Sequence, residues 1–187
     1  MIEEKVFENI DFTDKGLSDN EFDNCTFINC NFSNVNLSDF TLLEIMFDHC
    51  NLGTAKLNDT TLKDVEFKHC NLMGVDFGEV NKILLSLSFE GCRLDLSSFY
   101  KLKLKATRFS KCSIKEADFT ETDLSKSVFA ECDLDGAIFD RSNLEKVDFT
   151  SSDNYSIDPE NNRLKKAKFS RSGLHGLLGK HDIVIEI

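Results

Sequence analysis

A leucine, isoleucine or phenylalanine recurs at every fifth residue along most of the chain. The first run extends from Phe7 to Phe77 and the second from Phe89 to Phe149. A period of five matches neither the turn of an α-helix nor the alternation of a strand, so neither element could bury these side chains on one face. A short, fixed repeat instead indicates a solenoid, in which each unit buries its apolar residue by stacking on its neighbours.

The cysteines indicate how many repeats make one coil. Six of them fall into two series with a spacing of twenty residues, namely Cys30, Cys50 and Cys70, then Cys92, Cys112 and Cys132. Twenty residues are four repeats, so the same environment returns after four faces. The same spacing is expected to stack a column of phenylalanines, which includes Phe89, Phe109, Phe129 and Phe149. The sequence therefore predicts an all-β, right-handed quadrilateral β-helix with these cysteines and phenylalanines in its core ladder.

Two segments interrupt the repeat. The runs are out of phase by two residues, because Phe67 and Phe89 are twenty-two residues apart. We expect an irregular coil or kink over 78–88, where this slip lies, and a pause in the repeat over 150–162. Residues 1–174 are then one β-helical domain, followed by a cap over 170–187.

The last residues carry more apolar side chains than one coil can bury. Leu174, Leu177 and Leu178 have helix-like spacing, Gly179 would end that short helix, and 182–187 is predicted to be a strand. We expect a second copy to cover this end in a two-fold homodimer, and a monomeric cap is the alternative. The expected interface residues are Leu174, Leu177, Leu178, Ile183, Val184 and Ile185.

Composition limits the location and the metal chemistry of the chain. Its 187 residues include no stretch long enough to span a bilayer and no apolar N-terminal segment, so we expect a cytoplasmic protein without membrane contact. No CxxC spacing occurs, and buried thiols in a reducing compartment are the expected state of the cysteines. His49 and His69 could form a two-histidine surface site, but no zinc motif is present, and no metal or cofactor is expected.

Catalysis is not expected either. The sequence has no phosphate-binding loop, no nucleophile elbow and no Cys–His pair that would lie on one side of the chain. Stacked polar ladders also form no substrate cavity.

The charge of the chain is strongly negative and unevenly distributed. The net charge is −11, and residues 115–160 contain thirteen acidic and four basic residues. This acidity disfavours direct binding to nucleic acid, because it repels phosphate. An acidic rod could instead attract a protein whose own partner is DNA. The alternative is that the charge only maintains solubility and prevents end-to-end stacking.

Individual repeats resemble the pentapeptide repeat proteins, whose unit is written A(D/N)LXX. The units Ala117-Asp118-Phe119-Thr120-Glu121 and Cys70-Asn71-Leu72-Met73-Gly74 are the most similar, and the resemblance covers about residues 5–174. The pause with Ile157-Asp158-Pro159, the short helix and the terminal apolar run resemble the quinolone-resistance branch of that family (Qnr, MfpA and McbG types).

The resemblance implies a function. Members of that branch are cytoplasmic dimers that bind DNA gyrase, and often topoisomerase IV, as mimics of duplex DNA. They protect the enzyme from quinolones or other gyrase poisons, or they inhibit it. On this basis, we expect a non-enzymatic protein whose carboxylates occupy part of the DNA groove of a topoisomerase. The candidate residues are Asp118, Glu121, Asp123, Glu131, Asp133, Asp135 and Asp140. The alternative is a scaffold or adaptor without a topoisomerase role.

Overall fold

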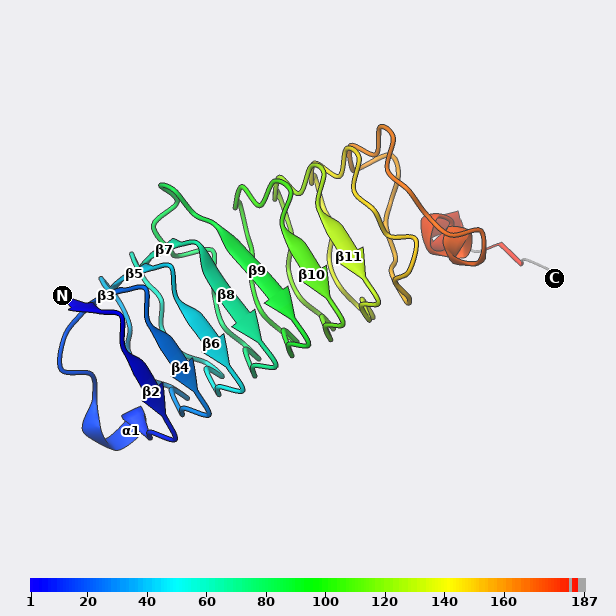
Figure 1. The fold of residues 1–187 in the computed structure, drawn as a ribbon. Coiled ribbons are helices and arrows are strands. Elements are labelled where there is room, and N and C mark those ends of the chain that lie inside the picture. Colours follow the sequence, from blue (N-terminus) through cyan, green and yellow to red (C-terminus); the bar gives the residue numbers. More distant parts are fainter. Residues whose placement is uncertain (182, 185–187) are drawn as a thin grey trace.

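The computed structural model describes residues 1–181, 183 and 184 of the chain. The chain winds into a right-handed quadrilateral β-helix, with the N-terminus at one end of the rod and residues 172–181 at the other (Figure 1). All strand pairs are parallel, with partners twenty residues apart in most coils, as in Phe27↔Phe47 and Phe109↔Phe129. The predicted fold is therefore confirmed.

We number the faces of the coil 1 to 4 in chain order, starting with the face that contains Phe7. Face 1 carries a sheet made of β2 (Val6–Glu8), β4 (Thr26–Ile28), β6 (Met46–Asp48), β8 (Val65–Lys68), β9 (Leu87–Glu90), β10 (Arg108–Ser110) and β11 (Val128–Ala130). Face 4 carries β1 (Ile2–Glu3), β3 (Glu21–Asp23), β5 (Thr41–Leu43) and β7 (Thr61–Lys63). Elsewhere on the rod, single parallel bridges join successive coils, such as Asn31↔Asn51 on face 2 and Ser98↔Asp118 on face 3.

The corners of the coil depend on a left-handed backbone conformation. The residue two positions after the central apolar residue has a positive φ in nearly every repeat, for example Glu121 (φ 56°) and Lys146 (φ 60°). For a residue other than glycine, this conformation costs about 1 kcal/mol or more, which the surrounding hydrogen-bonded coils must offset. The side chains at these corners are solvent-exposed in most repeats, so the corners carry much of the surface chemistry.

Stacked aromatic rings fill the core. A column of phenylalanines runs the length of face 1, with ring centroids 4.6–5.4 Å apart: Phe7, Phe27, Phe47, Phe67, Phe89, Phe109, Phe129, Phe149 and Phe169. A second column on face 3, from Phe77 to Phe139, meets the first edge-to-face. Both arrangements are favourable for aromatic pairs, so the columns join all coils into one core.

The second inward position makes a recurring hydrogen bond in many of the repeats that have a cysteine, serine or threonine there. The side chain two residues before the centre donates to a backbone carbonyl twenty-three residues earlier, as from Ser142 to Phe119 (2.7 Å) and from Thr122 to Phe99 (2.8 Å). The Cys50 thiol contacts the Phe27 carbonyl in the same way, at 3.3 Å. This position therefore favours small side chains that can also donate a hydrogen bond.

The phase slip is absorbed within one coil. Thr61 still pairs with Asn81, and Phe67 pairs with Phe89, so the two additional residues lie between Asn81 and β9. There the chain forms a loop that projects from the rod (green in Figure 1), with the side chains of Ile83 and Leu84 71% and 68% exposed. The stacking of the coils continues on both sides of this loop.

The two ends differ from the repeat. Near the N-terminus, α1 (Phe12–Lys15) is a single helical turn whose N-cap, Asp11, accepts a hydrogen bond from the Thr13 amide. At the other end, the expected helix is formed by two short 3₁₀ segments, η1 (Ser172–Leu177) and η2 (Gly179–His181). Gly179 therefore begins the second segment rather than ending a single helix. Ile183 and Val184 belong to no strand, and the rest of the predicted strand, 182 and 185–187, lies outside the described residues.

Candidate interaction surface

The seven candidate carboxylates are spread around the rod instead of forming one surface. Asp118, Glu121 and Asp140 lie on face 3 and the corner after it, and we call these three residues the face 3 cluster. The others are Asp123 on face 4, Asp133 and Asp135 on face 2, and Glu131 at the corner between faces 1 and 2. The structure therefore brings together three of the seven residues and separates the rest by face.

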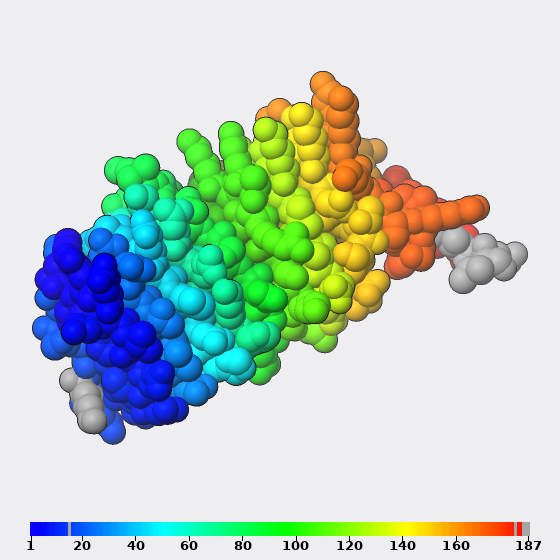
Figure 2. Space-filling view, viewed as in Figure 1, coloured from blue at the N-terminus to red at the C-terminus, as the bar shows by residue number. Residues whose placement is uncertain are grey.

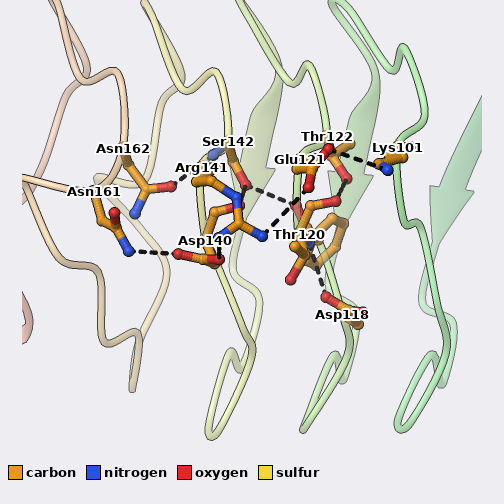
Figure 3. A network of polar contacts seen from close by, with 11 residues as sticks. Lys101, Asp118, Thr120, Glu121, Thr122, Asp140, Arg141, Ser142, Asn161 and Asn162 are labelled. Carbon is orange, nitrogen blue, oxygen red and sulfur yellow. Dashed lines mark hydrogen bonds and ion pairs between the residues drawn. The ribbon is translucent and has the colours of Figure 1, made fainter.

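The face 3 cluster is held in place by neighbouring coils (Figure 3). Glu121 lies between two cations, with Lys101 Nζ at 3.4 Å and Arg141 Nη2 at 3.3 Å. Arg141 also contacts Asp140 through Nη1 at 2.9 Å. Asp118 accepts a hydrogen bond from the Thr120 amide at 2.8 Å. Two cations therefore neutralise part of the charge of this cluster, and Asp118 keeps a carboxylate without an ion pair to any described residue.

Of the two candidate carboxylates on face 2, Asp133 is the one that forms contacts with neighbouring coils. The Asn154 amide donates to its Oδ1 at 2.8 Å, and Lys115 Nζ lies 3.0 Å from Oδ2. The Asn154 hydrogen bond, followed by the Lys115 contact, lowers the pKa of Asp133 although partial burial opposes this shift. This carboxylate is thus kept ionised, but its charge is shared with a cation of its own chain.

A more continuous acidic row exists elsewhere, and the sequence analysis did not identify it. Asp19, Asp39, Asp59 and Glu79 occupy the corner after face 3 in successive coils, the same corner as Glu121. Their spacing of twenty residues was the signal that could have revealed them. Among the described residues, only the N-terminal amine forms an ion pair with this row, at 2.7 Å from Asp19. We call these four residues with Glu121 the acidic edge, which Lys101 interrupts.

The C-terminal cap closes the core with an aromatic residue. Tyr155 is buried, with its ring centroid 5.6 Å from those of Phe149 and Phe169. Backbone of η1 lies directly against it, since a Cβ on Gly176 would be 2.2 Å from the Tyr155 carbonyl oxygen. Tyr155 was missed as a core residue because it follows Phe149 by six residues instead of five.

The residues expected at a dimer interface have different surroundings. Leu177 packs against the core of its own chain and Leu178 is half-buried. Leu174, Ile183 and Val184 are exposed, Val184 by 89%. Ile185 lies outside the described residues. An apolar surface thus remains at this end of the rod, although part of the expected interface already has a partner within the chain.

The cysteines and histidines form no metal centre within the part of the chain that the structure describes. All seven thiols are free and buried, and those of the core ladder donate to backbone carbonyls. His49 and His69 stack on the surface with ring centroids 4.8 Å apart. No group of three or more potential metal ligands occurs among the described residues. Likewise, none of the described helices is long and apolar enough to cross a membrane.

Comparison with known proteins identifies the repeat. A family model described as the pentapeptide repeat region matches residues 2–77, 82–153 and 103–177. The structure of a trypsin-treated variant of QnrB1, described as a plasmid-mediated fluoroquinolone resistance protein, superposes with a TM-score of 0.60 at 24% identity, covering 100% of this chain and 91% of that chain. A second trypsin-treated variant of QnrB1 gives a TM-score of 0.53 at 20% identity, with coverage of 98% and 99%.

At these identities, the structural matches establish the fold alone. No curated protein matches the chain by sequence. The family model covers most of the chain, and the repeat spacing, the stacked core and the left-handed corners agree with it. The chain therefore belongs to the pentapeptide repeat family.

Proposed function

We propose that this protein is a non-enzymatic DNA mimic that binds DNA gyrase or topoisomerase IV and protects the enzyme from quinolones or other gyrase poisons. The observation that carries the proposal is the acidic edge together with the face 3 cluster. These carboxylates follow one side of a rigid rod at intervals of about 4.8 Å per coil, the spacing of stacked strands. The similarity of the fold to QnrB1, described as a fluoroquinolone resistance protein, supports a role in protection from quinolones.

The mechanism follows from charge and rigidity. The groove of a topoisomerase that holds DNA is basic, and carboxylates on a rod would occupy it as phosphates do. The coil fixes the backbone position of each carboxylate, so the rod itself loses little conformational entropy on binding. Because Lys101 and Arg141 neutralise part of the face 3 cluster, attraction depends on several carboxylates together and not on a single one.

A supercoiling assay tests the proposal. Purified protein is titrated into gyrase with and without a fluoroquinolone, and supercoiling should be restored in the presence of drug or inhibited in its absence. For the triple variant Asp118→Lys, Glu121→Lys, Asp140→Lys, the protein concentration that gives the same effect should be at least tenfold higher than for the wild type. Wild-type protein without effect at well above micromolar concentration would contradict the proposal and favour an adaptor role.

A matched control separates location from net charge. Glu8, Glu90 and Asp153 are exposed on faces 1 and 2 and form no ion pair with a described residue. Changing all three to lysine alters the net charge by the same amount as the face 3 variant. The control should keep the activity of the wild type. An equal loss in both variants would show that overall charge, and not this surface, determines the effect.

We also propose that the protein acts as a homodimer joined through its C-terminal end. The exposed Leu174, Ile183 and Val184 support this arrangement, since a second copy would remove them from water. Sedimentation at micromolar concentration should give the mass of a dimer, and the variant Leu174→Asp, Val184→Asp should give that of a monomer. A monomeric wild type would exclude the dimer while leaving the topoisomerase proposal open.

A further inference from the structure

Positive and negative side chains are concentrated on different faces of the rod, although the net charge of the chain is negative. On the C-terminal half, face 4 and the corner after it carry seven cations, which we call the basic surface: Lys103, Lys105, Lys126, Lys146, Arg163, Lys165 and Lys166. Asp123 and Glu145 are the carboxylates of the same region, and they pair with Lys105 at 3.3 Å and Arg163 at 2.7 Å. Five lysines remain without an ion pair to any described residue.

The geometry of these lysines is regular. Positions 103, 123, 143 and 163 are bridged in register from coil to coil, and Lys126, Lys146 and Lys166 share one corner position with φ values of 60–66°. In the space-filling view, long side chains project in a row from the upper edge, along the green to orange part of the chain (Figure 2). Three coil steps at about 4.8 Å each give a straight basic track of about 14 Å.

We propose that the basic surface is a binding track for the phosphate backbone of duplex DNA. A duplex carries one negative charge per about 1.7 Å of its axis when both strands are counted, so the phosphates of the two strands along about 14 Å together suffice to pair with every free lysine. Lysine ammonium groups recognise phosphate as point charges, which suits contacts that do not depend on base sequence. An acidic protein would need carboxylates at the same regular intervals to pair with all five free lysines, whereas every DNA duplex has regularly spaced phosphates.

Of the acidic groups elsewhere on the C-terminal half, Glu121 borders face 4 but is partly neutralised by Lys101 and Arg141, and those of face 2 are distant. Face 2, with Asp133 and Asp135, lies on the opposite side of the core. Backbones of packed sheets are about 10 Å apart, and charges that point outward from opposite faces are separated further. The Debye length is about 10 Å at 0.1 M salt, so the charges of face 2 are largely screened at the basic surface. The net charge of −11 therefore does not describe the field along this track.

Fluorescence anisotropy with a labelled 20-base-pair duplex tests the proposal without any topoisomerase. Wild-type protein should bind with a Kd of about 1–100 µM at physiological salt, as other sequence-independent binders do, and more tightly at lower salt. Five phosphate contacts would give a slope of log K against log salt of about −4.5. In the variant Lys126→Glu, Lys146→Glu, Lys166→Glu, the slope should become shallower by about 2.7 and affinity at 50 mM salt should fall at least tenfold.

The control variant is Lys5→Glu, Lys56→Glu, Lys111→Glu, which changes the net charge equally at exposed lysines outside the basic surface. It should bind DNA within about threefold of the wild type. Circular dichroism spectra should show that both variants retain the β-helix. DNA-free gyrase should bind the basic-surface variant as well as the wild type, so this inference and the proposed function can fail separately.

Three results would overturn the inference, the third of which concerns the two lysine variants. One is the absence of salt-dependent DNA binding by the wild type at 50 mM salt. The other is binding of polyglutamate as tightly as duplex DNA of equal charge, which would assign the surface to acidic proteins. Equal weakening in the two lysine variants would also exclude a localised track.

Discussion

An interior ring of the face 1 column, Phe109, offers a direct measure of how strongly the coils are coupled. Phe109 is fully buried, and its ring stacks on Phe89 at 5.1 Å and on Phe129 at 4.6 Å. It also meets Phe99 and Phe119 edge-to-face at 5.9 and 6.0 Å. A buried Phe→Ala change costs about 3–5 kcal/mol, and each aromatic pair adds about 0.5–1.5 kcal/mol beyond its buried area. Measured Phe→Ala losses already include the lost ring contacts, so the four ring neighbours place Phe109→Ala in the upper part of that range, with a loss of about 4–5 kcal/mol in the free energy of unfolding.

Urea unfolding followed by far-UV circular dichroism gives this free energy. Phe7 is the matched control, because it is half-buried at the end of the same column and stacks on one ring of it, Phe27, at 4.8 Å. Phe7→Ala should cost about half as much, since an end coil has one neighbouring coil where an interior coil has two. Phe109→Leu keeps most of the buried volume but loses the four aromatic contacts, so it should cost more than about 1.5 kcal/mol and less than Phe109→Ala. A loss below about 2 kcal/mol for Phe109→Ala, or equal losses at both positions, would refute the reasoning that coil-to-coil stacking supplies the stability.

Three further predictions concern hydrogen bonding, the cap and pH. Ser142→Ala removes the donor to the Phe119 carbonyl and should cost about 1–2 kcal/mol in the same urea assay, whereas Ser142→Cys should cost less because cysteine occupies this position in other coils. Gly176→Ala would place a Cβ 2.2 Å from the Tyr155 carbonyl oxygen, so η1 should detach and amide hydrogen exchange there should rise; unchanged protection would contradict the packing described. The folded-state pKa of Asp133 is lowered, so its contribution is present above the ordinary aspartate pKa of about 4 and is lost as pH falls through the lowered value. The stability difference between the wild type and Asp133→Asn should therefore disappear in acid, and a difference that grows on acidification would reverse the assigned sign.

The core of this protein could be predicted almost completely from its sequence. The stacked core needs an apolar side chain at every fifth position. This pattern can be recognised in a single sequence because neither an α-helix nor a β-strand has a period of five residues. The cysteine spacing gave the coil length for the same reason, since Cys50 and Cys70 fill equivalent inward positions. The packing of the C-terminal cap was harder to predict from the sequence. Tyr155 enters the core six residues after Phe149 instead of five, and its burial depends on contact with η1.

The surface could be predicted only in part. Reading the acidic stretch 115–160 along the chain grouped residues that the coil distributes over different faces, such as Asp123 and Asp133. Reading positions at intervals of twenty would have found both the acidic edge and the lysines of the basic surface. The ion pairs of Glu121 with Lys101 and Arg141 join neighbouring coils, and side-chain reach decides whether they form. No rule of spacing supplies that information.

The loop before β9 shows that a coil can gain residues while Phe67 and Phe89 remain in register. The length of one coil can therefore change without disturbing its neighbours. An in-frame duplication of twenty residues would add one coil to the rod and leave the other coils as they are. Each such duplication would lengthen the rod by one coil, which is about 4.8 Å. A lineage of such proteins could adjust its reach along an elongated target by recombination alone, before any substitution refines the contacts.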